Sequence, residues 1–163
     1  MVSPESNPVA ASTVPAVGSA APEISLDTTS GAKATLSSLK GQKNVLLAFF
    51  PLAFTSTCTA EMCAFTEDYS AFDGKDVVVI PISVDSVPTL REFKAKHKIG
   101  VELASDFKRE ASRAYGVLMD TFFSNRAYFL IDRDGIIRWS HVEATPSSRR
   151  ENSEILAAVS ALG

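Results

Sequence analysis

The sequence of 163 residues has few cysteines, few histidines and no long hydrophobic run. Two cysteines, Cys58 and Cys63, are too few for the disulfide framework of a small secreted domain, and they fit a reducing, cytoplasmic setting better. The chain has only two histidines, His97 and His141, so the cysteines and histidines together do not form the set of ligands that zinc requires. It also lacks the C-x-x-C motif that a dithiol reductase would need.

Hydropathy and charge exclude two further classes of protein. No apolar run approaches the roughly 20 residues of a membrane helix, so we expect no membrane span. The net charge is −3 and the 16 Lys and Arg residues form no dense cluster, which argues against a nucleic-acid partner. Hydrophobic residues make up 45% of the chain, which is enough for the core of one domain.

The first 18 residues differ in composition from the rest of the chain. They are rich in Ser, Pro, Ala and Val and contain no Lys or Arg. They therefore lack both the charged start of a secretory signal and the arginines of a transit peptide. We predict a disordered tail over residues 1–18 and a single folded domain over residues 19–163.

The stretch around Cys58 combines a buried strand with an amphipathic helix. Residues 44–50 are apolar without alternation, which predicts a strand buried on both faces of a sheet. Pro51 ends that strand because proline has no backbone N–H. The helix that follows ends near Gly74. Apolar residues at helical spacing predict its inner face, which comprises Cys58, Met62, Phe65, Tyr69 and Phe72.

The remaining patterns predict an α/β domain. Strands are expected at 23–27, 34–36, 77–83, 128–131 and 136–139, with helices at 87–98, 109–115 and 149–162. The first two strands form an N-terminal β-hairpin, and Pro81 suggests a bulge or an irregular end in the third. Ser86 is the expected N-cap of its helix. This order predicts a central mixed β-sheet flanked by helices.

Cys58 falls in the first turn of a helix, just past the carboxyl end of a strand, where open α/β sheets place their sites. The unpaired N–H groups and partial positive charge of a helix N-terminus favour the thiolate, which is the nucleophilic form of cysteine. Burial against Phe49, Phe50 and Phe54 would oppose ionisation, so a reactive cysteine here needs a cation nearby. From this geometry alone, a packed small hydrophobic residue explains Cys58 equally well.

The spacing of three residues adds a family resemblance. Pro51, Thr55 and Cys58 form the pattern P-x-x-x-T-x-x-C, which resembles the active-site signature of the peroxiredoxins. Residues 43–55 are most similar to the alkyl hydroperoxide reductase E type. Residues 115–117 (Tyr-Gly-Val) and then Arg126 follow in the family's order. The resemblance implies a thioredoxin-like fold and a thiol-dependent peroxidase that uses no cofactor and acts on hydrogen peroxide and organic hydroperoxides.

The resemblance also implies a role for each residue of the motif. Arg126 would supply the missing cation, hold Cys58 as a thiolate and bind the peroxide; a side chain that only reaches solvent at a strand end is the alternative. Thr55 would bind the peroxide through its hydroxyl, or serve as a plain N-cap. Pro51 would shield the site. Glu61 would orient the arginine, unless it is an exposed carboxylate in the first helical turn.

The second cysteine bears on how the enzyme would be recycled. Peroxide would convert Cys58 to a sulfenic acid, and Cys63 is the candidate resolving thiol. Residues five apart on an ideal helix have Cα atoms about 8–9 Å apart. A disulfide needs less than roughly 7 Å, so the helix would have to unwind. The Q-type peroxiredoxins have this C-x4-C spacing, whereas the E type is best known with one cysteine, so a packed free thiol is the alternative for Cys63.

Several alternatives remain open at the level of sequence. A redox sensor or relay protein would use the same cysteine without efficient turnover. A Cys-His hydrolase would need His141 beside Cys58. The reductant implied by the resemblance is a thioredoxin-like protein or a low-molecular-weight thiol. A homodimer is possible, with Phe122 and Phe123 as either contact or core residues.

Overall fold

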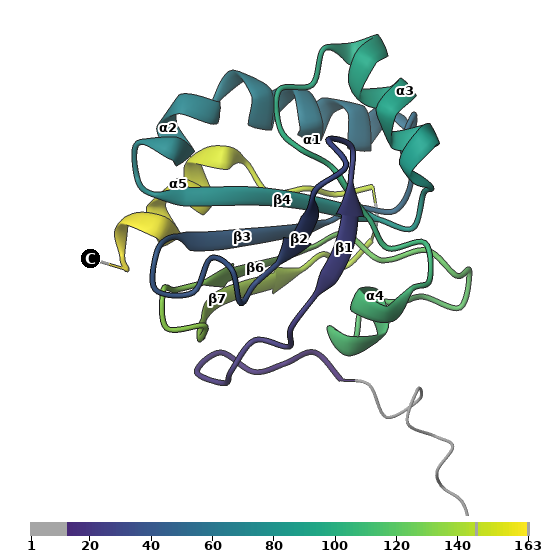
Figure 1. Cartoon of the computed structure of the whole chain (residues 1–163). Coiled ribbons are helices and arrows are strands. Elements are labelled where there is room, and N and C mark those ends of the chain that lie inside the picture. Colours follow the sequence, from purple (N-terminus) through teal and green to yellow (C-terminus); the bar gives the residue numbers. More distant parts are fainter. Residues whose placement is uncertain (1–12, 146, 163) are drawn as a thin grey trace, which may run out of the picture.

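The computed structural model describes residues 13–145 and 147–162, which build one sheet with helices on both faces (Figure 1). The strands are β1 (Ser25–Thr28), β2 (Lys33–Thr35), β3 (Asn44–Phe49), β4 (Val77–Ser83), β5 (Ala104–Ser105), β6 (Ala127–Ile131) and β7 (Ile137–Val142). The helices are α1 (Ser56–Glu67), α2 (Tyr69–Asp73), α3 (Val87–His97), α4 (Glu110–Ala114) and α5 (Asn152–Ser160).

The sheet is mixed, as the sequence predicts. Its strand order is β2-β1-β5-β4-β3-β6-β7. The pairs β3–β4 and β4–β5 are parallel, and the other neighbours, including the N-terminal hairpin β1–β2, are antiparallel. Since β3 is a central strand that leads directly toward α1, the start of α1 lies at the carboxyl edge of the parallel strands.

Strand β3 is buried on both faces, which explains its unbroken apolar sequence. Leu46 and Ala48 pack into a core that also contains side chains of α1, α3 and α5. Val45 and Leu47 point the other way, into a second core that includes residues of α4 and β1. In Figure 1 helices α1 and α3 lie above the sheet and α4 lies below it.

The predicted helix after Thr55 is interrupted in the structure. Helix α1 ends at Glu67, and a separate short helix, α2, begins at Tyr69. Between them Asp68 leaves the helical conformation, with φ −98° and ψ 13°, and its carboxylate accepts a hydrogen bond from Asn152 of α5. The interruption changes the phase of the helical face, so Tyr69 is 51% exposed and its predicted inward position is wrong.

Two other expectations need correction. Pro81 causes no bulge, because β4 pairs with β3 in continuous register and pairs with β5 only from Ile82 onward. Helix α5 begins at Asn152 rather than at residue 149, and the backbone N–H of Arg150 donates to a tyrosine hydroxyl outside the helix. The cap of α3 is confirmed, because the Ser86 side chain accepts from the N–H of Thr89.

Most of the predicted N-terminal tail, residues 1–12, lies outside the described residues. At the end of the predicted tail, Gly18 donates its N–H to the carbonyl of Ile137 at 2.7 Å. Just beyond it, Ala20 forms an isolated bridge with Ile136. These bonds attach residues 18–20 to the outer strand β7. The boundary at residue 19 stays a prediction.

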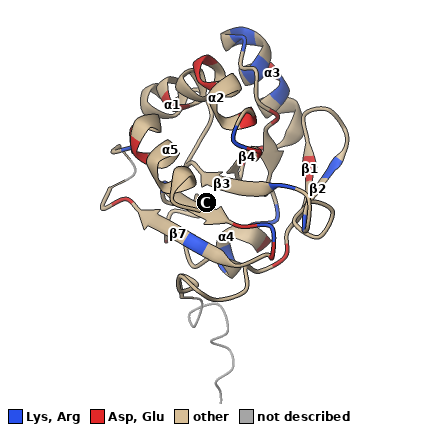
Figure 2. Cartoon of the chain, turned by 90° about the vertical axis from the view of Figure 1, so that its left-hand side faces the viewer, with Lys and Arg blue, Asp and Glu red and all other residues tan. Residues whose placement is uncertain are grey.

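Among the described residues, none of the helices is both long and apolar enough to cross a membrane. Segments coloured for Lys and Arg are conspicuous on α3 (Figure 2), whose last turn carries Lys94 and Lys96. Positive charge at that end stabilises the helix by complementing its dipole. The Lys94 ammonium also donates to the carbonyls of Ile99 and Val101, so it has a local structural role.

Candidate active site

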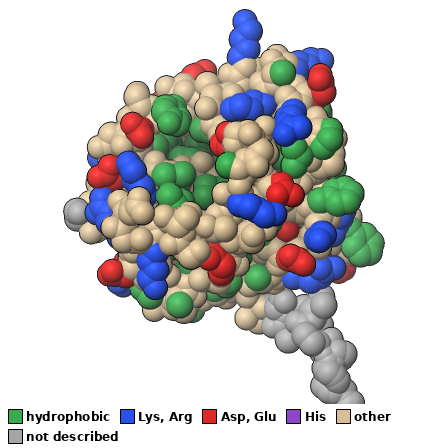
Figure 3. Space-filling model, viewed as in Figure 1, with side chains coloured by type: hydrophobic (Ala, Val, Ile, Leu, Met, Phe, Trp, Pro, Cys, Tyr) green, Lys and Arg blue, Asp and Glu red, His purple; other side chains and the backbone are tan. Residues whose placement is uncertain are grey.

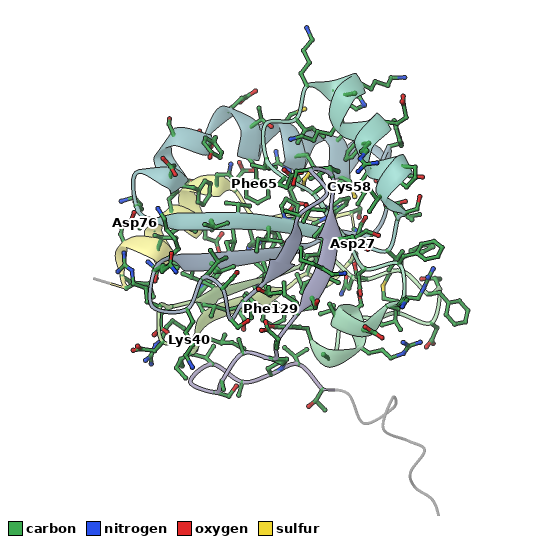
Figure 4. The ribbon with its side chains drawn as sticks, in the orientation of Figure 1. Asp27, Lys40, Cys58, Phe65, Asp76 and Phe129 are labelled. Atoms are coloured by element: carbon green, nitrogen blue, oxygen red, sulfur yellow. The ribbon has the colours of Figure 1, made fainter. Side chains whose placement is uncertain are left out.

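Cys58 is the third residue of α1 and is fully buried. It faces the sheet with Met62 and Phe65 of the same helix, in the core that also contains Phe50 (Figure 4). Its position therefore confirms the predicted first-turn cysteine just beyond the end of β3. The free N–H groups of the first turn and the N-terminal end of the helix dipole lie at the sulfur's end of the helix.

The cation missing from the local sequence comes from the residue that immediately precedes β6. Strand β6 pairs antiparallel with β3, and Phe49 lies opposite Ala127, so Arg126 reaches the level of the loop that precedes α1. The Arg126 side chain is only 1% exposed, and its Nη2 donates to Cys58 Sγ at 2.9 Å. Two residues that are 68 positions apart in sequence are thus in direct contact.

Glu61 lies on the inner face of α1, one turn beyond Cys58. It is buried rather than exposed, and its Oε1 accepts from Arg126 Nη1 at 2.6 Å. Burial raises the pKa of Glu61 above the ordinary glutamate value, although Arg126 and Tyr128 act in the opposite direction. Glu61 and Cys58 therefore bind two different nitrogens of one planar guanidinium.

Tyr128 completes this cluster. From the sequence pattern it is only a residue of the strand predicted at 128–131. Its hydroxyl donates to Glu61 Oε2 at 2.6 Å and accepts from the backbone N–H of Arg150 at 3.0 Å. Burial and the neighbouring Glu61 raise the pKa of Tyr128. Its spacing from Arg126 could have indicated that it lies near the site, because residues two apart on extended backbone share one face.

The loop before α1 holds the remaining predicted residues. Pro51 is buried, whereas Thr55 is exposed at the N-cap position. The Thr55 hydroxyl makes no capping bond and donates instead to the carbonyl of Leu52 at 2.8 Å. Phe54 is 46% exposed with φ +69°, and its ring packs on Phe93 of α3, so its expected burial at Cys58 is wrong.

Side chains from other strand ends anchor this loop. The backbone N–H of Ala53 donates to Asp85 Oδ2 at 2.8 Å, and the hydroxyl of Ser83 donates to the same oxygen. On the other side, the Ser124 hydroxyl donates to the carbonyl of Phe50 at 3.0 Å. The loop is therefore fixed between the end of β4 and the segment that leads into β6.

Cys63 is half-buried on α1, and both cysteines are free thiols. Since α1 is continuous from Ser56 to Glu67, the two thiols occupy different faces of an intact helix, as the spacing predicts. His141, on β7, contacts Glu143 at 3.2 Å. Within the described part of the chain, no group of three or more His, Cys, Asp and Glu residues could hold a metal ion.

The arrangement places the sulfur of Cys58 at a helix N-terminus, beside an arginine whose other nitrogen is held by a buried carboxylate. A guanidinium and the N–H groups of a helix end both stabilise negative charge on sulfur. The same donors can stabilise negative charge that develops on a small substrate bound at the sulfur. The site is therefore suited to nucleophilic attack by a thiolate.

Comparisons with known proteins agree with this chemistry. Residues 17–140 match the model of the AhpC/TSA family. Alkyl hydroperoxide reductase E of Mycobacterium tuberculosis is 35% identical over 150 residues, covering 89% of this chain and 98% of that protein. Chloroplastic peroxiredoxin Q of Oryza sativa subsp. japonica is 34% identical over 124 residues, which are 75% of this chain and 57% of that protein.

A solved structure is similar in fold as well as in sequence. The reduced 2-Cys peroxiredoxin of Plasmodium vivax superposes with a TM-score of 0.85 and 33% identity. The match covers 91% of this chain and 82% of that one. The thioredoxin-like fold of the peroxiredoxins expected from the sequence is thereby confirmed.

Proposed function

Because the chain belongs to the AhpC/TSA family of peroxiredoxins, which are thiol peroxidases, we propose that Cys58 is the residue that reacts with peroxide. The observation that carries this proposal is the contact of 2.9 Å between Arg126 Nη2 and Cys58 Sγ. A buried guanidinium at this distance favours the thiolate and opposes the cost of burying its charge.

The proposed reaction is a nucleophilic displacement. The Cys58 thiolate attacks one peroxide oxygen, an S–O bond forms and the O–O bond breaks. The sulfur is oxidised by two electrons to a sulfenic acid, and the peroxide is reduced to an alcohol or to water as the leaving oxygen takes up a proton. Arg126 stabilises the leaving oxygen. Thr55 orients the peroxide through its hydroxyl, and Pro51 limits access of water.

Recycling of the sulfenic acid is proposed to use Cys63 as the resolving thiol. The two cysteines lie on one intact helix, so a disulfide between them requires the first turns of α1 to unwind. That unwinding separates Cys58 from Arg126. A thioredoxin-like protein or a low-molecular-weight thiol in a reducing, cytoplasmic setting then restores the two thiols.

The test is a single-turnover experiment with hydrogen peroxide and with an organic hydroperoxide. Wild-type protein and Cys63→Ser should consume one equivalent at similar rates, and Cys58→Ser should consume none. Mass spectrometry should find an intramolecular disulfide in the oxidised wild type and a sulfenic acid in Cys63→Ser. If the Cys58→Ser protein still consumes peroxide, the proposed role of Cys58 is wrong. If the oxidised wild type contains no disulfide, the proposed role of Cys63 as resolving thiol is wrong.

Turnover separates the peroxidase from a redox sensor. Repeated peroxide consumption with a thioredoxin-like or small-thiol donor supports the enzyme. Oxidation of one equivalent that no such donor reverses supports the sensor that the sequence left open.

We also propose that the protein forms a homodimer through the aromatic residues beside α4. Phe107 and Phe122 are 61% and 65% exposed, and Figure 3 shows large hydrophobic side chains protruding at that edge of the molecule. Arg109 donates to the carbonyls of both phenylalanines, which fixes their backbone at the surface. Sedimentation of wild type and Phe122→Ser tests this: a dimer that becomes a monomer supports the interface, and unchanged sedimentation contradicts it.

A further inference from the structure

We propose that Tyr128 is a positioning residue of the active site, whose hydroxyl holds Glu61 in the orientation that presents Arg126 to Cys58. This inference rests on the proposed role of Cys58 as the reactive thiolate. Neither the family signature nor the spacing of the cysteines involves this tyrosine.

Tyr128 lies on β6, two positions after Arg126, which is the residue immediately before the strand. Residues two apart on extended backbone share one face, and both of these side chains reach Glu61 of α1. Tyr128 is fully buried in the core that contains Cys58 and Met62. Its hydroxyl therefore meets protein groups rather than bulk water.

The Tyr128 hydroxyl bonds to both Arg150 and Glu61. A backbone N–H can only donate, so the bond from Arg150 at 3.0 Å makes the Tyr128 oxygen an acceptor. The hydroxyl proton is then directed to Glu61 Oε2 at 2.6 Å, while Arg126 Nη1 donates to Glu61 Oε1 at 2.6 Å. Both oxygens of Glu61 accept hydrogen bonds in this arrangement, as the two oxygens of a carboxylate can.

Glu61 in turn sets the orientation of the Arg126 guanidinium toward the sulfur of Cys58. While Tyr128 occupies one oxygen of Glu61, the carboxylate binds Arg126 through its other oxygen. The second nitrogen of the guanidinium is then directed at Cys58. Without the hydroxyl, a buried carboxylate oxygen loses a donor, and such a loss is unfavourable. A carboxylate readily binds guanidinium through both oxygens, so Arg126 would turn its second nitrogen from Cys58 to Glu61.

The same hydroxyl links the site to the segment between β7 and α5. The backbone of Arg150 is held by Tyr128, and its side chain binds Glu143 at 2.9 Å. The carbonyl of Glu143 accepts from Asn125, the residue before Arg126. These bonds hold in place the Arg150 backbone that donates to the Tyr128 hydroxyl.

The chain offers a matched control for the substitution Tyr128→Phe. Tyr115 is also fully buried, and its hydroxyl also makes a hydrogen bond of 2.6 Å, to the carbonyl of Pro22. It lies in the core on the opposite face of the sheet, away from Cys58. Tyr115→Phe should therefore remove a comparable buried hydrogen bond without touching the site.

The experiment measures the rate of Cys58 alkylation by iodoacetamide against pH, in a Cys63→Ser background so that one thiol reacts. Tyr128→Phe should shift the pH profile to higher pH and slow alkylation at neutral pH by about tenfold, with a smaller change at the alkaline plateau. Tyr115→Phe should leave the profile in place. A Tyr128→Phe profile that coincides with that of the background protein, or an equal shift in Tyr115→Phe, overturns the inference.

A double-mutant cycle tests whether Tyr128 acts through Glu61. In a Glu61→Gln background, Tyr128→Phe should change the profile much less than in the parent protein. An undiminished effect overturns the proposed route. These outcomes are independent of the peroxidase proposal, because alkylation involves no peroxide; failure of the wild type to consume peroxide would remove that proposal and leave the alkylation result standing.

Discussion

Replacing Arg126 with lysine retains the positive charge but removes the geometry on which the site depends. The guanidinium binds Glu61 through one nitrogen at 2.6 Å and Cys58 through another at 2.9 Å. A lysine ammonium is a single nitrogen on a flexible stem. We expect the lysine ammonium to stay with Glu61, because a buried carboxylate without a partner is costly. The Cys58 thiolate, by contrast, can become neutral by binding a proton.

The expected effect follows from the contact that is lost. A hydrogen bond to a charged group contributes about 1.5–3 kcal/mol. If that contribution is lost from the reacting thiolate, Arg126→Lys should slow Cys58 oxidation about 10- to 150-fold at neutral pH. Stopped-flow fluorescence of the half-buried Trp139 under single-turnover conditions measures this rate, with Cys63→Ser as the background.

A second arginine provides the control. Arg138 binds Asp132 at 2.6 Å on the outer strand β7, so Arg138→Lys makes the same substitution in an ion pair away from the sulfur. It should leave the oxidation rate unchanged. An Arg126→Lys rate within about twofold of the parent protein would refute the argument that paired geometry, rather than charge alone, activates Cys58.

Three further predictions concern the framework. Burial opposes ionisation of Asp132, but bonds from Arg138 and the turn backbone outweigh it and lower its pKa below the ordinary value of 3.8. Asp132→Asn should therefore cost about 0.5–1 kcal/mol at neutral pH, and the difference should vanish as the pH falls below 3.8 in acid denaturation experiments. Asp85→Ala removes the acceptor of the Ala53 N–H, so it should slow peroxide oxidation more than alkylation of the thiol; equal effects would contradict a role confined to the loop. Ser86→Ala should lower the unfolding free energy by about 0.5–1 kcal/mol in urea and leave the peroxidase rate unchanged, and a change in rate would contradict a purely local cap.

The sequence was sufficient to predict the elements whose signals are local. Strand β3 has an apolar run with no alternation because both of its faces are buried, and the structure confirms that interpretation. The cap of α3 and the position of Cys58 in the first turn of α1 also depend on a few adjacent residues. The position of Arg126 beside Cys58 could be predicted only from the family resemblance. The pairing of β6 with β3 that brings Arg126 to the sulfur has no local signal in the sequence.

The misses arise where tertiary contacts override local pattern. The helix expected to run to near Gly74 is interrupted at Asp68, which binds Asn152, 84 positions away in sequence. Phe54 appeared apolar enough for the core, yet its positive φ turns it outward onto α3. The role proposed for Tyr128 depends on a buried partner in α1, and spacing alone could only place it on the face of Arg126.

The central claim is the proposal that Arg126 and the N-terminal end of α1 stabilise negative charge on the sulfur of Cys58 and so make it reactive. The most direct test is the pH profile of Cys58 alkylation by iodoacetamide in the Cys63→Ser protein, compared with that of free cysteine. The account predicts that alkylation at neutral pH is already close to its alkaline plateau. If the alkylation rate of Cys58 at neutral pH is only a small fraction of its plateau rate, as for free cysteine, the account is contradicted.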